Sequence, residues 1–152
     1  MQNPNSVNWL ILPDSHLYIS LHERPSKLPR IEITGNPRGM VSIANIFLWL
    51  ASPTTDFDSI SITALPFISV DSALSLTAHL LPEDEVETKY HGKLVRLDKS
   101  VQYEWQASEQ QIINVTLLVH QLGCTPETGD YGVSLNPNSD ADMRFELISY
   151  EQ

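Results

Sequence analysis

Cysteine and glycine are scarce in this 152-residue sequence, and each shortage excludes a class of protein. The single cysteine, Cys124, has no partner within the chain, so an internal disulfide framework is excluded. One thiol also fits a reducing compartment. Only six glycines are present, and none belongs to a phosphate-binding loop of the Walker or Rossmann type.

Long apolar runs are also missing. The longest early run, from Trp9 to Leu12, is too short for the apolar core of a signal peptide. No stretch approaches the roughly 18 apolar residues that a membrane span requires. We therefore expect a cytoplasmic protein that has no membrane partner.

Basic residues are few, nine against nineteen acidic ones, which gives a formal net charge of −10. Such a surface repels phosphate backbones and anionic lipids, so nucleic-acid binding is not expected. It favours a basic protein partner instead. The alternative is that the acidic surface only keeps the protein soluble.

The length and the 41% hydrophobic content are those of one globular domain. The first residues are polar, so we expect a flexible tail over residues 1–8 and a single domain over 9–152.

The strongest helix signal begins at Asn36-Pro37, because Asn caps free backbone N–H groups and Pro suits the first helical position. A continuous apolar face then follows in steps of three and four residues, at Met40, Ile43, Ala44, Phe47, Leu50 and Ala51. Pro53 ends the pattern, which predicts a helix over about 37–51. Trp49 falls on the opposite, polar face, where it would either contact a partner or pack against its own chain.

Most of the remaining sequence favours strands. Alternating apolar residues predict them at 16–21, 30–34, 59–64 and 73–80, with hairpins formed by 93–97 with 101–106 and by 131–135 with 143–149. The segment 111–120 is ambiguous: Ser108 and Gln111 have the spacing of a helix capping box, whereas the row Ile113, Val115, Leu117 and Val119 alternates. We favour a strand there.

The predicted fold is therefore α+β, a largely antiparallel and strand-rich sheet with one main helix packed on it. A sandwich with one helix is the alternative. Eight residues are expected in the core: Ile43, Phe47, Leu50, Ile62, Leu76, Val115, Leu117 and Phe145.

No convergent catalytic or metal-binding motif is present. Oxygen-bearing side chains alternate from Asn136 to Asp142, as in a calcium loop, but Ala141 replaces the sharp-turn glycine, so a polar turn is the better interpretation. His120 and Cys124 make only half a zinc site. We predict no catalytic, cofactor-binding or metal residue, and an enzyme is disfavoured without being excluded.

The acidic residues are densest at Glu83, Asp84, Glu85 and Glu87. Like charges this close together repel one another, which is typical of an exposed loop. Together with Trp49, these carboxylates are the candidate contacts for a basic partner. The alternative is a solvated loop with no partner.

One segment resembles a known family. The residues Gly35-Asn36-x-x-Gly39-Met40, followed by Ile43-Ala44 and Leu50-Ala51, are similar to a pattern of a bacterial family of polymorphic-toxin immunity proteins, with Met40 and Ile43 where that pattern has leucine. Members of that family are small cytoplasmic proteins that bind and neutralise a toxin. The resemblance implies a strand–turn–helix unit and an immunity function. It assigns no binding residue.

Three functional hypotheses follow. The first is a non-enzymatic protein that binds a basic toxin by occlusion and uses no cofactor. The second is a ligand- or carbohydrate-binding β-rich module in which Tyr103, Trp105 and Tyr131 stack on the ligand. The third is an enzyme whose pocket would combine His79, His120 and an acidic residue.

Overall fold

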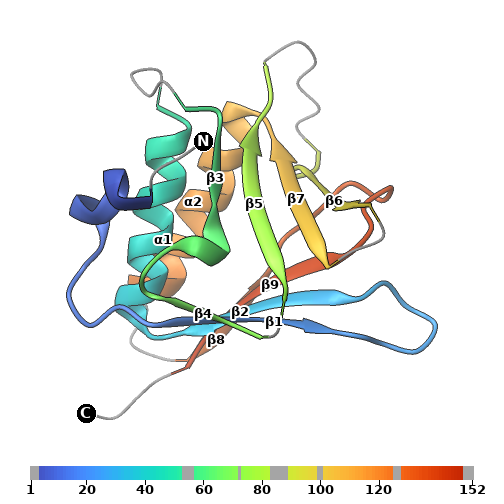
Figure 1. Ribbon diagram of the computed structural model, residues 1–152, viewed down its shortest axis with the longest axis horizontal. Helices are drawn as coiled ribbons and strands as arrows, with labels where there is room; N and C mark the ends of the chain where they lie inside the picture. Colours follow the sequence, from blue (N-terminus) through green and yellow to red (C-terminus); the bar gives the residue numbers. More distant parts are fainter. Residues whose placement is uncertain are drawn as a thin grey trace.

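The computed structural model describes residues 4–52, 57–71, 73–82, 89–98, 101–124 and 128–148. Within these residues the fold is α+β, with two α-helices and nine strands in two mixed sheets (Figure 1). None of the helices in this part of the chain is long and apolar enough to cross a membrane.

Sheet A has five strands and sheet B has four. In spatial order, sheet A contains β4 (Ile68–Val70), β1 (Leu17–His22), β2 (Arg30–Gly35), β9 (Asp142–Leu147) and β8 (Gly129–Gly132). Sheet B contains β3 (Ser59–Ser61), β5 (Ser75–Leu80), β7 (Gln102–Ala107) and β6 (Lys93–Leu97).

The predicted hairpin of 93–97 with 101–106 is confirmed, whereas that of 131–135 with 143–149 is confirmed in part, because β8 covers residues 129–132. In place of one largely antiparallel sheet there are two sheets, and both are mixed. β6 pairs with β7 and β8 pairs with β9 in antiparallel register, as do β1 with β2 and β3 with β5. The pairs β1–β4, β2–β9 and β5–β7 are parallel. Parallel neighbours are joined by long connections, and alternation within a strand does not identify a distant partner.

Helix α1 (Pro37–Leu50) confirms the predicted helix to within one residue. The Asn36 side chain caps it by accepting a hydrogen bond from the backbone N–H of Gly39 at 2.8 Å. Five of the six apolar positions expected from the sequence are buried in α1, and the sixth, Ala51, is buried directly after its last residue.

The predicted strand at 111–120 is wrong, because the segment lies within helix α2 (Glu109–Cys124). The capping box decides the outcome: the Ser108 N–H donates to Gln111 Oε1 at 2.9 Å, and the Gln111 N–H donates to Ser108 Oγ at 3.3 Å. Val115 is fully buried, whereas Leu117 is 63% exposed. Two residues that would share a face of a strand therefore point in different directions from a helix.

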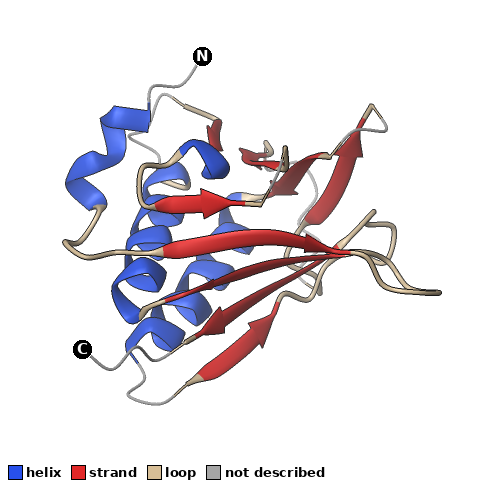
Figure 2. Ribbon diagram, turned by 60° about the horizontal axis from the view of Figure 1, so that its bottom comes forward, coloured by secondary structure: helices blue, strands red, loops and turns tan. Residues whose placement is uncertain are grey.

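One core joins both sheets to the helices. The Phe47 ring of α1 meets Trp105 of sheet B at 5.2 Å and Phe145 of sheet A at 6.4 Å, both edge to face. Figure 2 shows the two α-helices side by side against the strand layer. Of the eight predicted core residues, all except Leu117 are buried.

Two 3₁₀ helices lie where the sequence predicted other structure, one in the N-terminal segment and one in the predicted strand over 59–64. Pro4–Leu10 forms η1, which overlaps the predicted tail of residues 1–8, and the Val7 side chain is fully buried. The predicted strand over 59–64 is divided into β3 and a single 3₁₀ turn, η2 (Ile62–Ala64).

Candidate interaction surface

The residues that resemble the immunity family are used for packing. The Asn36 amide accepts hydrogen bonds from the backbone N–H groups of Gly39 and His16 and donates to the Asp14 carbonyl at 2.7 Å. A Cβ atom at Gly35 or Gly39 would lie 2.2 or 2.6 Å from the His16 carbonyl oxygen. The glycine–asparagine motif therefore holds the segment before β1 against the start of α1.

Trp49, one of the predicted contacts, packs on its own chain. Its ring lies 5.7 Å from that of Phe57, and the side chain is half-buried against the hydrophobic core. Of the two interpretations of Trp49, intramolecular packing is the one that its neighbours support.

The other predicted contacts, Glu83, Asp84, Glu85 and Glu87, lie outside the described residues. The chain before them is described as far as Pro82, and the Leu80 N–H donates to the Asp58 carbonyl.

The rings proposed to stack on a ligand are largely inaccessible. Tyr103 and Trp105 are buried, and the Trp105 indole N–H donates to the His91 carbonyl at 3.0 Å. The hypothesis that these two rings form an exposed aromatic groove is wrong, because β7 directs both into the core. Tyr131 is half-buried and stacks on Phe145 at 6.3 Å.

The histidines of the enzyme hypothesis lie on different elements. His79 lies on β5 and His120 lies on the exposed side of α2, where its Nδ1 is 3.7 Å from Cys124 Sγ. Among the described side chains, no group of three His, Cys, Asp or Glu residues is arranged to hold a metal ion.

The calcium-like segment is a turn that also covers the outer edge of β6. Asn136 Oδ1 accepts from the Asn138 N–H, Ser139 Oγ accepts from the Leu94 N–H, and Asp140 Oδ2 accepts from the Arg96 N–H. Backbone bonds from the Asn136 N–H to the Gly92 carbonyl and from the Asp140 N–H to the Leu94 carbonyl complete this contact. Asn136 and Asp140, two of the residues that suggested a cation site, thus hold the turn and its contact with β6, and Asp142 pairs with Arg24. These bonds support the polar-turn interpretation.

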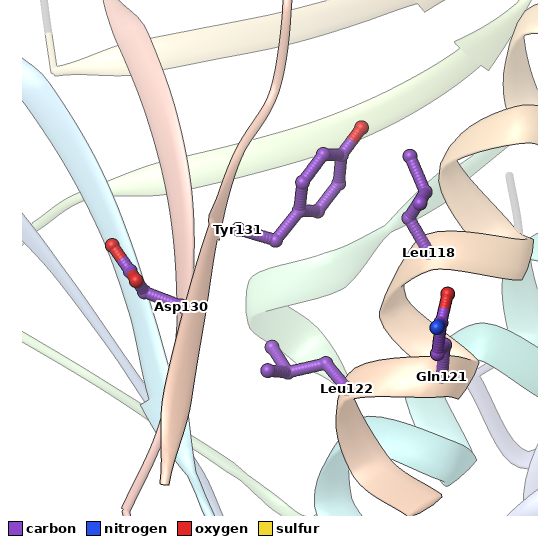
Figure 3. A pocket seen from close by; sticks show the side chains of 5 residues that line it. All are labelled: Leu118, Gln121, Leu122, Asp130 and Tyr131. Atoms are coloured by element: carbon purple, nitrogen blue, oxygen red, sulfur yellow. The ribbon is translucent and has the colours of Figure 1, made fainter. Parts of the chain in front are cut away.

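A surface that the sequence did not reveal lies where α2 meets β8. Leu118 of α2, 38% exposed, borders a hollow of about 230 Å³ that is also lined by Gln121, Leu122, Asp130 and Tyr131 (Figure 3). Leu117, which precedes Leu118 in α2, is the most exposed leucine among the described residues. We call Leu118 and the hollow the α2–β8 surface.

The two β8 side chains at this surface point to opposite faces of sheet A. Figure 3 shows Tyr131 directed toward α2 and Asp130 directed away from it. Burial raises the pKa of the Tyr131 hydroxyl to about 12, and the hydroxyl oxygen lies 3.2 Å from His91 Nδ1.

The outer face of sheet A beside Asp130 is charged. Arg144 of β9 pairs with Asp130 at 2.7 Å, with Glu146 at 3.4 Å and with Glu32 of β2 at 3.8 Å. Glu32 also pairs with Arg30 at 3.3 Å. Three carboxylates thus share two guanidinium groups in this row, so it retains negative charge.

The sequence did not predict the α2–β8 surface, for two reasons. The strand prediction placed Leu117 in the core, and no local pattern indicates that β8 is the last strand of its sheet. Two signals could have corrected the strand prediction: the capping box at Ser108 and the helical spacing of the buried stripe from Ile112 to Gly123. Comparisons of the chain with protein-family models, curated proteins and solved structures gave no match.

Proposed function

We propose that this protein binds another protein, that its partner is basic, and that it acts by occlusion without catalysing a reaction. The observation that carries the proposal is the α2–β8 surface, where the exposed Leu118 and a hollow lie beside carboxylates on a chain of net charge −10. Apolar contact supplies affinity at such a surface, and complementary charge supplies orientation and speed of association.

Neutralisation of a toxin is the specific form of this function that we favour. It is supported by the resemblance of residues 33–51 to an immunity family and by the acidic charge, which suits a basic toxin. Asn36 and the neighbouring glycines are occupied by internal packing, so the contact with a toxin would involve other residues. A toxin-encoding reading frame beside the gene would support this form, and an isolated housekeeping locus would oppose it.

The other two hypotheses have less support. A stacking site for a carbohydrate would need rings that face solvent, and Tyr103 and Trp105 do not. An active site built on His79 and His120 would need the side chains of β5 and α2 to meet in one pocket, and His120 lies on the exposed side of α2.

A capture experiment tests the proposal. The tagged protein and its Leu118→Gln variant are incubated with lysate of the native organism, and bound proteins are quantified by mass spectrometry at low and high salt. Leu28→Gln is the matched control, because Leu28 is similarly exposed, at 41%, but lies in the β1–β2 connection. We expect a basic protein that the control retains, that Leu118→Gln loses by at least tenfold, and that weakens as salt rises.

Capture that is indifferent to both Leu118→Gln and salt would contradict the proposal. So would the absence of any enriched basic protein.

A further inference from the structure

The geometry points to the mode of binding: the open edge of β8 accepts an extended segment of the partner as an additional strand of sheet A. This inference rests on the proposed function, since it specifies which part of a basic protein would be bound. Strand addition of this kind takes affinity from main-chain hydrogen bonds and specificity from alternate side chains.

Among the described residues, the register of β8 leaves one hydrogen-bonding edge without a backbone partner. The Val133 N–H donates to the Met143 carbonyl at 2.9 Å, which continues the ladder in which Tyr131 is opposite Phe145. Hydrogen-bonded pairs alternate along antiparallel strands. The N–H and C=O groups of Asp130 and Gly132 therefore point away from β9, and no described residue forms a backbone hydrogen bond with them outside the ladder.

The edge of β8 differs from that of β6. Segment 134–140 covers β6 through bonds to His91, Gly92 and Leu94. An exposed edge is a template for another strand unless something blocks it. At β8 the chain instead offers a hollow for a side chain directly beside the edge.

The two faces of sheet A define the chemistry of the added strand. On the inner face, the side chain beside Tyr131 would enter the hollow between Leu118 and Leu122, and these two leucines with the Tyr131 ring favour an apolar residue. On the outer face, the next residue of the added strand would lie beside Asp130, and Glu146 of β9 lies one strand further in. Both carboxylates share the single guanidinium group of Arg144, so a basic residue is favoured there. The bound segment should therefore alternate apolar and basic residues.

A second copy of this chain is a poorer occupant. Joining two β8 edges would bring the Asp130 side chains of both copies together at one seam. Each copy would also add a net charge of −10 to the assembly. A basic segment removes both sources of repulsion.

Gly132→Pro tests strand addition directly. The substitution removes an N–H that points away from β9, and open space surrounds the position, since nothing lies within 4 Å of a Cβ built there. Proline is tolerated on an edge strand where its nitrogen faces solvent. Gly132→Ala is the matched control, because it adds the Cβ and keeps the N–H.

The probe is an eight-residue peptide of alternating valine and lysine with blocked ends, compared with a valine–glutamate peptide of the same length. Titration calorimetry measures affinity, and amide NMR shifts locate the site. We expect the lysine peptide to bind the wild type and Gly132→Ala, to shift the Asp130 and Gly132 amides, and to bind Gly132→Pro at least tenfold more weakly. Failure to bind the wild type, or equal binding to Gly132→Pro, would overturn strand addition.

Two further outcomes separate this inference from the proposed function. A basic protein captured from lysate equally by the wild type and Gly132→Pro would overturn strand addition and leave the proposed function standing. Self-association of the free protein in sedimentation experiments, abolished by Gly132→Pro, would overturn the basic occupant in favour of a second copy.

Discussion

Asn36 shows how much of the fold depends on a single side chain. Its amide caps α1 and also bonds to two backbone groups of residues 14–16, while the Asn36 N–H donates to the His16 carbonyl at 3.1 Å. The side chain is buried, so a lost partner would leave a polar group without solvent. The hydrogen bonds of Asn36 thus account for the presence of asparagine at this position.

Gly39→Ala is expected to lower the free energy of unfolding by about 1–3 kcal/mol, because the added Cβ would lie 2.6 Å from the His16 carbonyl oxygen. Alanine is otherwise the better helix former, so propensity alone predicts stabilisation. Urea denaturation gives the measurement. Gly132→Ala is the control and should stay within about 0.5 kcal/mol of the wild type. A stabilised Gly39→Ala variant would show that the approach of residue 16 is not restrictive.

Tyr131 should make stability sensitive to alkaline pH. Its pKa in the folded protein is about 12, raised by burial from an ordinary value near 10, so the folded state favours the neutral hydroxyl. The full contribution is therefore present below pH 10 and is lost as the pH rises through about 12. Urea midpoints between pH 9 and 11.5 should fall more steeply for the wild type than for Tyr131→Phe. Parallel curves would contradict the prediction.

At the scale of elements, local signals located most strands and α1 but misjudged α2. Asn36-Pro37 and the apolar face of α1 agree with each other, so that helix was predictable. In residues 111–120 two patterns compete, and the alternating row includes Leu117, which the structure exposes. The stripe that α2 buries, from Ile112 through Val119 to Gly123, follows helical spacing equally well.

The order of the strands could not be predicted from local sequence patterns. β2 and β9 are neighbours although more than a hundred residues separate them in sequence. That pairing makes β8 an edge strand and places it beside α2. The α2–β8 surface therefore depends on long-range pairing, while the charge that would attract a basic partner was already evident from composition.

Paired substitutions on α2 distinguish a helix from a strand by stability. Val115→Ala should cost about 2 kcal/mol, because the side chain is fully buried. Leu117→Ala should change the free energy of unfolding by less than about 0.5 kcal/mol, since most of its side chain is in water. Urea denaturation of both variants provides the comparison. Similar losses at both positions would mean that they share a buried face, as the strand interpretation required.

At the scale of the whole molecule, Phe47 is the point where the two sheets meet. Sheet A and sheet B have no strand in common, yet Phe47 contacts Trp105 of one and Phe145 of the other. Segment 134–140 adds hydrogen bonds from the β8–β9 connection to the edge of β6. Both features couple the sheets, which is the basis for proposing that the described residues fold as a single domain, with Val7 of the expected tail in its core.

Unfolding should therefore be cooperative across both sheets. Native-state hydrogen exchange should give the slowest amides of β2 and β9 the same opening free energy as those of β5 and β7. Phe47→Leu should lower both values together, because the smaller side chain loses contact with Trp105 and Phe145 at once. Leu48→Ala is the control: its side chain is exposed on the same helix, so neither sheet should respond. If Phe47→Leu lowered the exchange protection of amides in one sheet only, the prediction would be wrong. The two sheets would then be separate folding units that are each stable alone.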